Sequence, residues 1–310
     1  MSIFSRLTLF LVCVGLLSAY SAFSSSYLDS KGKKAIEPEN IPPVSIQLWS
    51  VNETLKKDFA GTLKAISKMG FEAVEFAGHF GPYGEDPQGL KKFLDSLHLK
   101  VSGAHVKMRD LTDDKFLNTV RFYQQLGTPM LIVPSDKRAE HADTIDAFVA
   151  QVNKVAAKMR DTGMGFGFHN HDRELVQYQN STFWDYIATH TADDFILQLD
   201  VGWTVYAGKD PVAYINRYPN RTLTTHLKAK FPSNTKGKKP LIGQDITNWA
   251  SVIRACVING GTQWLVLEQE EYPDGLSQLE AVEKSKQGLD AVIRQITAVK
   301  ATHLSLSSAQ

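Results

Sequence analysis

The chain has 310 residues, of which 43% are hydrophobic and 22% are charged, proportions that are ordinary for a globular protein. Its net charge of +1 provides no strong field that would gather nucleic acid or an anionic membrane, so the composition argues against both partners. The length is sufficient for one large domain or two small ones.

The first segment of the chain has the pattern of a secretory signal. Arg6 is followed by an apolar run of about 14 residues, which is shorter than the roughly 20 that a membrane span requires. Small residues suited to signal peptidase follow, at Ala19–Ser21 or Ala22–Ser24. We therefore expect residues 1–24 to be a signal peptide and the mature protein to be periplasmic or secreted, without stable membrane insertion. An uncleaved anchor is the alternative interpretation.

The segment after the signal, residues 25–43, is rich in Ser, Lys and Glu and is predicted to form a disordered linker. Residues 44–300 contain no Pro/Gly-rich linker, which favours a single domain, and residues 301–310 are expected to be a disordered tail. Cleavage of the signal would leave Cys256 as the single cysteine, so the sequence predicts neither an intrachain disulfide nor a cysteine metal cluster.

Short apolar runs recur along the rest of the chain, mostly at intervals of about 26–40 residues. Each run predicts a β-strand that is buried on both faces, as strands of parallel sheets are. The eight runs are Val44–Leu48, Ala73–Phe76, Lys100–His105, Met130–Pro134, Gly165–His169, Phe195–Asp200, Thr222–Lys228 and Trp264–Gln269.

Stretches with helical periodicity lie between these runs, and several of them end at a glycine, which fits a helix C-cap. The clearest predicted helices are residues 59–69, 111–126, 142–159, 246–258 and 279–296. Strand, helix and glycine, repeated eight times over about 260 residues, predict a single (β/α)8 TIM barrel of the α/β class. A doubly wound sheet is the rival, but it has fewer units, and no Gly-x-Gly-x-x-Gly motif follows the first strand.

Polar and aromatic side chains stand at the predicted carboxyl ends of the strands, where TIM barrels carry their chemistry. Polar groups there would be costly to bury without partners, and their number is typical of a convergent polar site. These residues are Gln47, Trp49, Glu75, His79, His105, His169, His171, Asp200, Trp203, His226, Lys228, Glu268 and Glu270.

The last four strand ends carry side chains of the kind that transition metals bind. Asp200, His226 and Glu268 are predicted metal ligands, and the fourth ligand is His169 or His171. These two histidines point to the same face of a strand because they are two residues apart. A mixture of imidazole and carboxylate predicts one divalent metal, zinc or manganese rather than magnesium.

The chain resembles the xylose isomerase-like TIM barrel superfamily, in its sugar phosphate isomerase/epimerase branch, over about residues 44–297. The resemblance rests on the order and strand placement of VEFAG, FHNHD, LDVGW, THLKAK, GQDITNW and VLEQEEY, none of which is specific by itself. In that family, residues from strands 5 to 8 hold a divalent metal, often manganese. The resemblance implies Asp200, His226 and Glu268 as ligands. It places His169 where the isomerases and epimerases have a glutamate.

The histidine at position 169 bears on the chemistry that the resemblance implies. In the epimerases, the corresponding glutamate is half of a two-carboxylate proton shuttle. Related branches with histidine-rich fifth strands include inositol-ketone dehydratases and lyases that open 3-keto-glycosides. All share removal of a C–H proton next to a carbonyl, after which reprotonation gives isomerisation or epimerisation, and loss of a β-oxygen gives elimination. We predict a sugar isomerase or epimerase, with a lyase or dehydratase as the alternative.

Side chains around the predicted metal have expected roles in such a reaction. His171 or Glu270 is the expected base, and Lys228 is expected to stabilise the oxyanion. The predicted contacts to a carbohydrate substrate come from Glu75, His105, Trp49 and Trp203. Export of the protein favours an unphosphorylated sugar or sugar derivative, and no Gly-rich phosphate loop follows strands 7 or 8.

Other classes of protein fit the sequence less well. An amidohydrolase would carry its His-x-His motif on the first strand, and a DNA endonuclease of the same superfamily would need more ligands and a basic groove. A non-catalytic sugar-binding barrel remains an alternative because the strand 5 glutamate is missing. The sequence is also compatible with a homo-oligomer.

Overall fold

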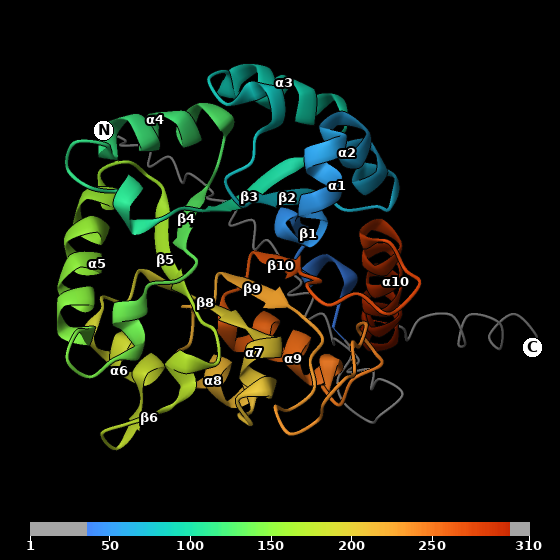
Figure 1. Ribbon diagram of the computed structural model, residues 1–310. Helices are drawn as coiled ribbons and strands as arrows, with labels where there is room; N and C mark the ends of the chain where they lie inside the picture. Colours follow the sequence, from blue (N-terminus) through green and yellow to red (C-terminus); the bar gives the residue numbers. More distant parts are fainter. Residues whose placement is uncertain (1–35, 298–310) are drawn as a thin grey trace, which may run out of the picture.

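The computed structural model of the protein describes residues 36–297 and shows a closed barrel of eight parallel strands (Figure 1). The strands are β1 (Val44–Gln47), β2 (Ala73–Phe76), β3 (Lys100–His105), β4 (Met130–Val133), β5 (Gly165–His169), β8 (Phe195–Asp200), β9 (Thr224–Leu227) and β10 (Trp264–Leu267). They follow one another around the barrel in chain order, and β10 pairs with β1 to close it. The predicted single TIM barrel of the α/β class is therefore confirmed.

The strands are apolar runs because both of their faces are covered, one by the barrel interior and the other by helices. All four residues of β4 and all six of β8 are buried. Buried polar side chains stand at or next to the carboxyl ends of several strands, among them Glu75, His169, Asp200 and His226. Their position places the candidate site at one end of the barrel.

Helices form the outer layer around the strands (Figure 1). They are α1 (Asn52–Lys57), α2 (Phe59–Lys68), α3 (Pro87–Ser96), α4 (Phe116–Leu126), α5 (Ile145–Arg160), α6 (Phe183–His190), α7 (Val201–Tyr206), α8 (Pro211–Arg217), α9 (Trp249–Ala255) and α10 (Gln278–Thr297). A short antiparallel hairpin of β6 (Gln177–Tyr178) and β7 (Ser181–Thr182) precedes α6. The last helix, α10, lies beside the first helices, so the two ends of the described chain meet at the barrel closure.

Two helices begin later in the structure than the sequence predicts. The helix expected over residues 111–126 begins at Phe116, because the Thr112 hydroxyl donates to the Arg109 carbonyl at 3.1 Å and to Asp114 at 2.6 Å. Such local bonds compete with the helical ladder. The helix expected over residues 246–258 begins at Trp249, because the Asn248 side chain caps its first turn.

The position of Ile36 shows that the predicted disordered linker extends too far toward the C-terminus. Its side chain is buried in the core, and its backbone N–H donates to the Ile296 carbonyl of α10 at 3.1 Å. Residues 38–40 then form a 3-10 turn. The ordered domain therefore begins before residue 44, because this apolar side chain covers the last helix.

Some predictions concern segments that the structure does not describe. The expected signal peptide (1–24), the first part of the linker and the expected tail (301–310) lie outside residues 36–297. Within those residues, no helix is both long and apolar enough to cross a membrane.

Candidate metal centre and active-site cavity

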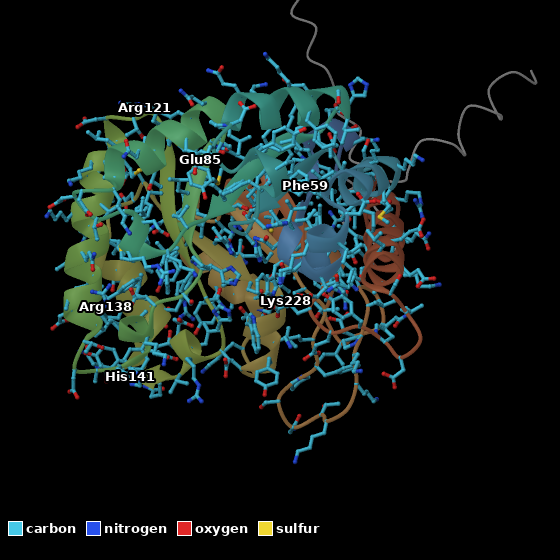
Figure 2. The ribbon with its side chains drawn as sticks, turned by 45° about the horizontal axis from the view of Figure 1, so that its top comes forward. Phe59, Glu85, Arg121, Arg138, His141 and Lys228 are labelled. Atoms are coloured by element: carbon cyan, nitrogen blue, oxygen red, sulfur yellow. The ribbon has the colours of Figure 1, made fainter. Side chains whose placement is uncertain are left out.

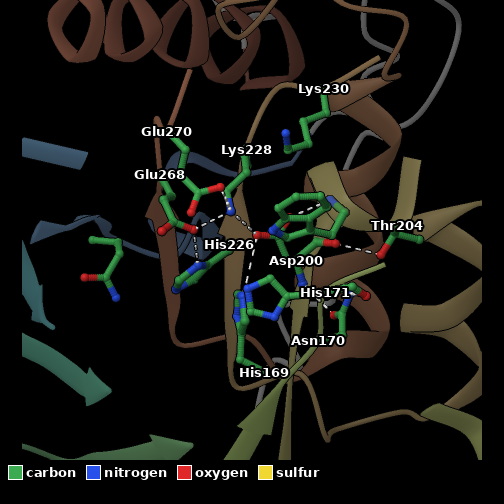
Figure 3. Close-up of polar contacts among 12 residues, drawn as sticks. His169, Asn170, His171, Asp200, Thr204, His226, Lys228, Lys230, Glu268 and Glu270 are labelled. Carbon is green, nitrogen blue, oxygen red and sulfur yellow. Dashed lines mark hydrogen bonds and ion pairs between the residues drawn. The ribbon is translucent and has the colours of Figure 1, made fainter. Parts of the chain in front are cut away.

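The polar strand ends of β5, β8, β9 and β10 converge in one cluster at the mouth of the barrel (Figure 3), and Glu75 of β2 contacts this cluster through His226. Figure 2 shows Lys228 near the middle of the molecule, whereas Arg121, Arg138 and His141 lie toward its periphery. A cavity of about 820 Å³ opens above the cluster, and His169, Lys228 and Glu268 contribute to its floor.

Asp200 ends β8 and is held in place from two directions. Its backbone N–H donates to Asn170 Oδ1 at 2.9 Å, and its Oδ1 accepts the Trp203 N–H at 2.8 Å as the N-cap of α7. Gly202 allows this turn to approach β9, since a Cβ there would lie 2.6 Å from the Lys228 carbonyl oxygen. The other carboxylate oxygen, Oδ2, is buried and receives no well-directed hydrogen bond from the part of the chain that the structure describes. The Lys228 ammonium lies 2.9 Å from Oδ2, so this buried oxygen already faces a cation.

His169 ends β5 with its ring oriented by Gln198. The Gln198 Oε1 accepts from His169 Nδ1 at 3.0 Å and from His105 Nε2 at 2.8 Å. Because Nδ1 carries the proton in that bond, Nε2 of His169 presents a lone pair. Nε2 lies 3.7 Å from Asp200 Oδ2. Burial and the nearby His226 hold the pKa of His169 well below its usual value, so the imidazole is neutral and able to bind a metal.

His226, on β9, lies between two carboxylates. Its Nε2 is 2.6 Å from Glu75 Oε1, and its Nδ1 is 2.9 Å from Glu268 Oε2. Burial lowers the pKa of His226, but the charges of Glu75 and Glu268 outweigh burial and raise that pKa to about 10. A carboxylate behind a histidine in this way is the arrangement that orients imidazole ligands at metal sites.

The Lys228 ammonium occupies the centre of a carboxylate triangle. Its Nζ lies 2.9 Å from Asp200 Oδ2, 2.9 Å from Glu268 Oε2 and 2.8 Å from Glu270 Oε2. Burial lowers the pKa of Lys228, but the three carboxylates outweigh it and raise that pKa above its ordinary value. Asp200 and Glu268 thus use the same oxygens for the ammonium that they would use for a metal.

Four potential ligands come together at this place. One ligand atom from each of His169, Asp200, His226 and Glu268 lies within 4.8 Å of the other three, and all four residues are buried. Nε2 of His169 lies 3.7 Å from Asp200 Oδ2, so a metal between them would replace the contact of that oxygen with the Lys228 ammonium. The donor set of two imidazoles and two carboxylates fits zinc or manganese. The residues present therefore fit a divalent metal.

His171 lies beside the cluster, on the cavity side. Its ring centroid is 5.1 Å from that of His169 and 5.5 Å from that of Trp203, and it lines the cavity. Its backbone N–H donates to Glu174 Oε2 at 2.8 Å, which fixes the loop after β5. Burial and the Lys228 charge lower the pKa of His171, so its imidazole is neutral near pH 7. A neutral imidazole at a cavity wall can accept a proton.

The chain is similar in sequence to known proteins. The family model described as "Xylose isomerase-like TIM barrel" matches residues 63–295. The chain belongs to this family. The inosose dehydratase of Lacticaseibacillus casei is 24% identical over 272 residues, which covers 76% of this chain and 90% of that protein.

Solved structures of the family share the fold of this xylose isomerase-like barrel. A sugar phosphate isomerase/epimerase from Parabacteroides distasonis superposes with a TM-score of 0.67 at 23% identity, covering 79% of this chain and 96% of that one. An L-ribulose 3-epimerase superposes with a TM-score of 0.61 at 16% identity, covering 84% of this chain and 99% of that one. At these identities, the likeness establishes the fold.

Of the four residues predicted to contact the substrate of this family member, two line the cavity and two do not. His105 and the half-exposed Trp49 line the cavity. Trp203 does not line it and instead packs against His171, with the Lys230 ammonium 4.3 Å from its ring centroid. Glu75 is fully buried below the cluster, so the prediction that it binds sugar hydroxyls does not fit its position.

Three buried residues that position the xylose isomerase-like site were missed by sequence reasoning, namely Gln198, Asn170 and Glu174. Gln198 links Glu75 to both His105 and His169, since its Nε2 also donates to Glu75 Oε2 at 2.8 Å. The signal that could have revealed it is a polar residue inside the apolar run FILQLD, at the face shared with Asp200.

Proposed function

We propose that the protein is a divalent-metal-dependent enzyme that removes the proton next to the carbonyl of an unphosphorylated sugar or cyclitol and then eliminates a hydroxyl group as water. The observation that carries this proposal is the grouping of the four potential ligands at the floor of a cavity. The same cavity is lined by His171, Lys228 and Glu270, which can move and stabilise charge around a substrate bound there.

The metal would be held by His169, Asp200, His226 and Glu268. When bound, it would polarise a substrate carbonyl and so acidify the adjacent C–H bond. Glu75 supports this role, because its bond to Nε2 of His226 would hold the ring in place while Nδ1, which contacts Glu268 in this structure, gives up its proton to bind the metal. The donor set favours zinc or manganese over magnesium.

His171 is the proposed base. It is neutral near pH 7, lines the cavity and is held by Glu174 through its own backbone. It would take the proton from the carbon next to the carbonyl, while the C–H electrons form a carbon–carbon double bond and the carbonyl oxygen becomes an oxyanion. Lys228 would stabilise that negative oxygen through its ammonium group.

Glu270 is the proposed acid for the elimination. Burial and the charge of Glu268 raise the pKa of Glu270 although the Lys228 ammonium opposes them, so this carboxylate takes up a proton more readily than an ordinary glutamate. As the oxyanion returns to a carbonyl, the bond to the β-hydroxyl breaks, and the departing oxygen takes the Glu270 proton and leaves as water. His171 then gives up its proton, and Glu270 regains one, through solvent. The inosose dehydratase relatives support this outcome over the others.

Isomerisation or epimerisation, our first expectation from sequence, is the second candidate function. The isomerase and epimerase names of the structural neighbours support it. It needs a second proton carrier on the opposite face of the substrate. In this chain the family's strand 5 glutamate is replaced by His169, whose Nδ1 is committed to Gln198. Glu270 would have to serve alone as the carboxylate partner of His171.

Deuterium exchange separates these candidates. Manganese- or zinc-loaded protein is incubated in D2O with inosose, unphosphorylated keto-sugars and 3-keto-glycosides. Loss of water from the substrate supports the dehydratase, release of an aglycone identifies a glycoside lyase, and deuterium uptake without elimination identifies an isomerase or epimerase. The variant His171→Asn is expected to abolish each of these while still binding metal, and His141→Asn, at the periphery, is the matched control.

Two outcomes would overturn the proposal. Absence of both exchange and elimination across the panel, with metal bound, would leave a sugar-binding barrel without catalysis. Turnover of phosphorylated sugars far above that of their free counterparts would contradict the proposed substrate class, which is supported by the expected export of the protein.

A further inference from the structure

The cavity extends well beyond the candidate metal cluster. Its floor is formed at the ends of β3, β5, β9 and β10, but its volume of about 820 Å³ reaches outward over the segments that follow β2 and β3 and over one side of α4. We call this outward part the outer compartment, and it is lined by Phe80, Glu85, Lys107, Arg109, Asn118 and Phe122. One six-membered ring at the floor would leave the outer compartment unfilled, since cavities of this size hold ligands of several rings.

Aromatic rings form the inner wall of the outer compartment. Phe80 and Phe122 lie with ring centroids 4.8 Å apart, and both are half-buried, so each keeps part of its ring facing the cavity. Phe122 is further supported by Tyr123 at 5.4 Å. A supported ring at a cavity wall offers an apolar face with little loss of conformational entropy on binding, which suits the C–H face of a sugar ring.

Polar side chains form the rim. Lys107, Arg109 and Asn118 are exposed, and their side chains form no hydrogen bond or ion pair within residues 36–297. The acids Glu85 and Asp110 also line the cavity, so its rim carries two cations and two carboxylates, of which Asp110 lies 4.0 Å from the Lys115 ammonium. The balanced charge argues against selection of an anion, and the uncommitted donors and acceptors suit hydroxyl groups.

We propose that the outer compartment is a subsite for a second, neutral sugar ring, joined to the ring that lies on the metal floor. The substrate would then be a disaccharide or a glycoside of comparable size rather than a lone cyclitol. This inference rests on the proposed function for the identity of the reacting ring, but the subsite itself is defined by binding.

The test compares binding of one-ring and two-ring sugars to the manganese-loaded full chain by calorimetry or ligand-observed NMR. The probes are glucose and three neutral disaccharides, maltose, cellobiose and trehalose. At least one disaccharide is expected to bind about tenfold more tightly than glucose or better. Phe122→Ala and Asn118→Ala are expected to remove most of that difference while leaving glucose binding within about twofold.

Arg121→Ala is the matched control, because Arg121 is an exposed residue of the same helix that does not line the cavity. It is expected to change neither affinity. Asn118 is exposed, so its substitution reports on the subsite even if Phe122→Ala fails to fold. The subsite is overturned if no disaccharide binds more tightly than glucose, if none of the four sugars binds, or if both variants weaken glucose and disaccharide equally.

The binding test of the subsite and the exchange test of the proposed function can fail independently of each other. Selective disaccharide binding without proton exchange would retain the subsite and reject the reaction. Exchange on one-ring substrates without selective disaccharide binding would retain the reaction and reject the subsite.

Discussion

The two halves of the barrel mouth are built in different ways. At the ends of β5, β8, β9 and β10, charged side chains are buried and pair with one another, as in the contacts of Lys228 with its three carboxylates. Over the segments that follow β2 and β3 and along α4, the cavity is open, and polar side chains such as Asn118 and Arg109 are exposed at its rim. We call these the dense half and the open half.

The difference follows from what each half has to bind. Buried charges are costly unless they are paired, so the dense half is stable only as a balanced set of acids and cations into which one more cation must fit. The open half leaves its groups to water, which a ligand can displace at low cost. Substitutions in the dense half test whether it is a metal site and how its balance of charges is kept.

Removal of a ligand charge should have the largest effect. Asp200→Asn keeps an oxygen to cap α7 but removes the carboxylate that faces His169 and Lys228, so metal affinity is expected to fall by about 100-fold or more. The measurement is metal titration by calorimetry. Asp210→Asn, at the equivalent exposed cap of α8, is the control and should leave affinity unchanged. An Asp200→Asn variant that binds metal normally would exclude Asp200 as a ligand.

Substitution of Glu75 should have the next largest effect on metal affinity. Glu75→Gln removes the carboxylate that orients His226, and metal affinity is expected to fall by roughly 10- to 100-fold, as for other residues behind a metal ligand. Glu72→Gln, on the segment just before β2, serves as the control. Unaltered metal affinity together with weakened sugar binding would instead restore the original expectation that Glu75 contacts substrate.

Substitution of Lys228 should raise the metal affinity, whereas substitution of Asp200 or Glu75 should lower it. The ammonium uses the oxygens that a metal would use, so Lys228→Met is expected to raise metal affinity by about tenfold while the metal-free protein unfolds at a lower temperature. Lys230→Met is the control, since Lys230 pairs with Glu271 outside the cluster. Weaker metal binding by the Lys228 variant would show that the lysine assists the metal and does not compete with it.

A pH-dependent effect on stability, separate from metal affinity, is expected at Glu174, beneath the loop that carries His171. Burial raises the pKa of Glu174 to about 7, above its usual 4.5, so the folded protein holds a proton that the unfolded chain releases. Stability from this group is present at low pH and is lost as pH rises through about 7. Glu174→Gln should therefore be more stable than the parent at pH 8, by up to about 3 kcal/mol, and similar to it at pH 4.

Thermal or denaturant unfolding at both pH values provides the measurement for Glu174. Glu140→Gln, which removes a neighbouring charge that raises the same pKa, should show a smaller change in the same direction. Equal stability differences at both pH values would show that folding does not raise the pKa of Glu174.

Much of the site could be predicted from local pattern. The FHNHD, LDVGW and THLKAK segments each end an apolar run, and the parallel arrangement brings such ends to one mouth of the barrel. This reasoning reached His169, Asp200, His226 and Glu268 as a group, and the structure places their ligand atoms together. It could not separate His169 from His171, because their spacing places both on one face of an extended strand, whereas β5 ends at His169 and His171 lies in the loop that follows.

The sequence by itself determined the barrel, the position of the site and the kinds of side chain in it, since strand periodicity and residue chemistry are local properties. Only the tertiary structure decided which atoms meet. Glu75 and His226 are 151 positions apart and contact each other only because the barrel closes. From the sequence, Lys228 is predicted to stabilise an oxyanion. Folding surrounds its ammonium with three carboxylates, because a charge is costly to bury without a partner.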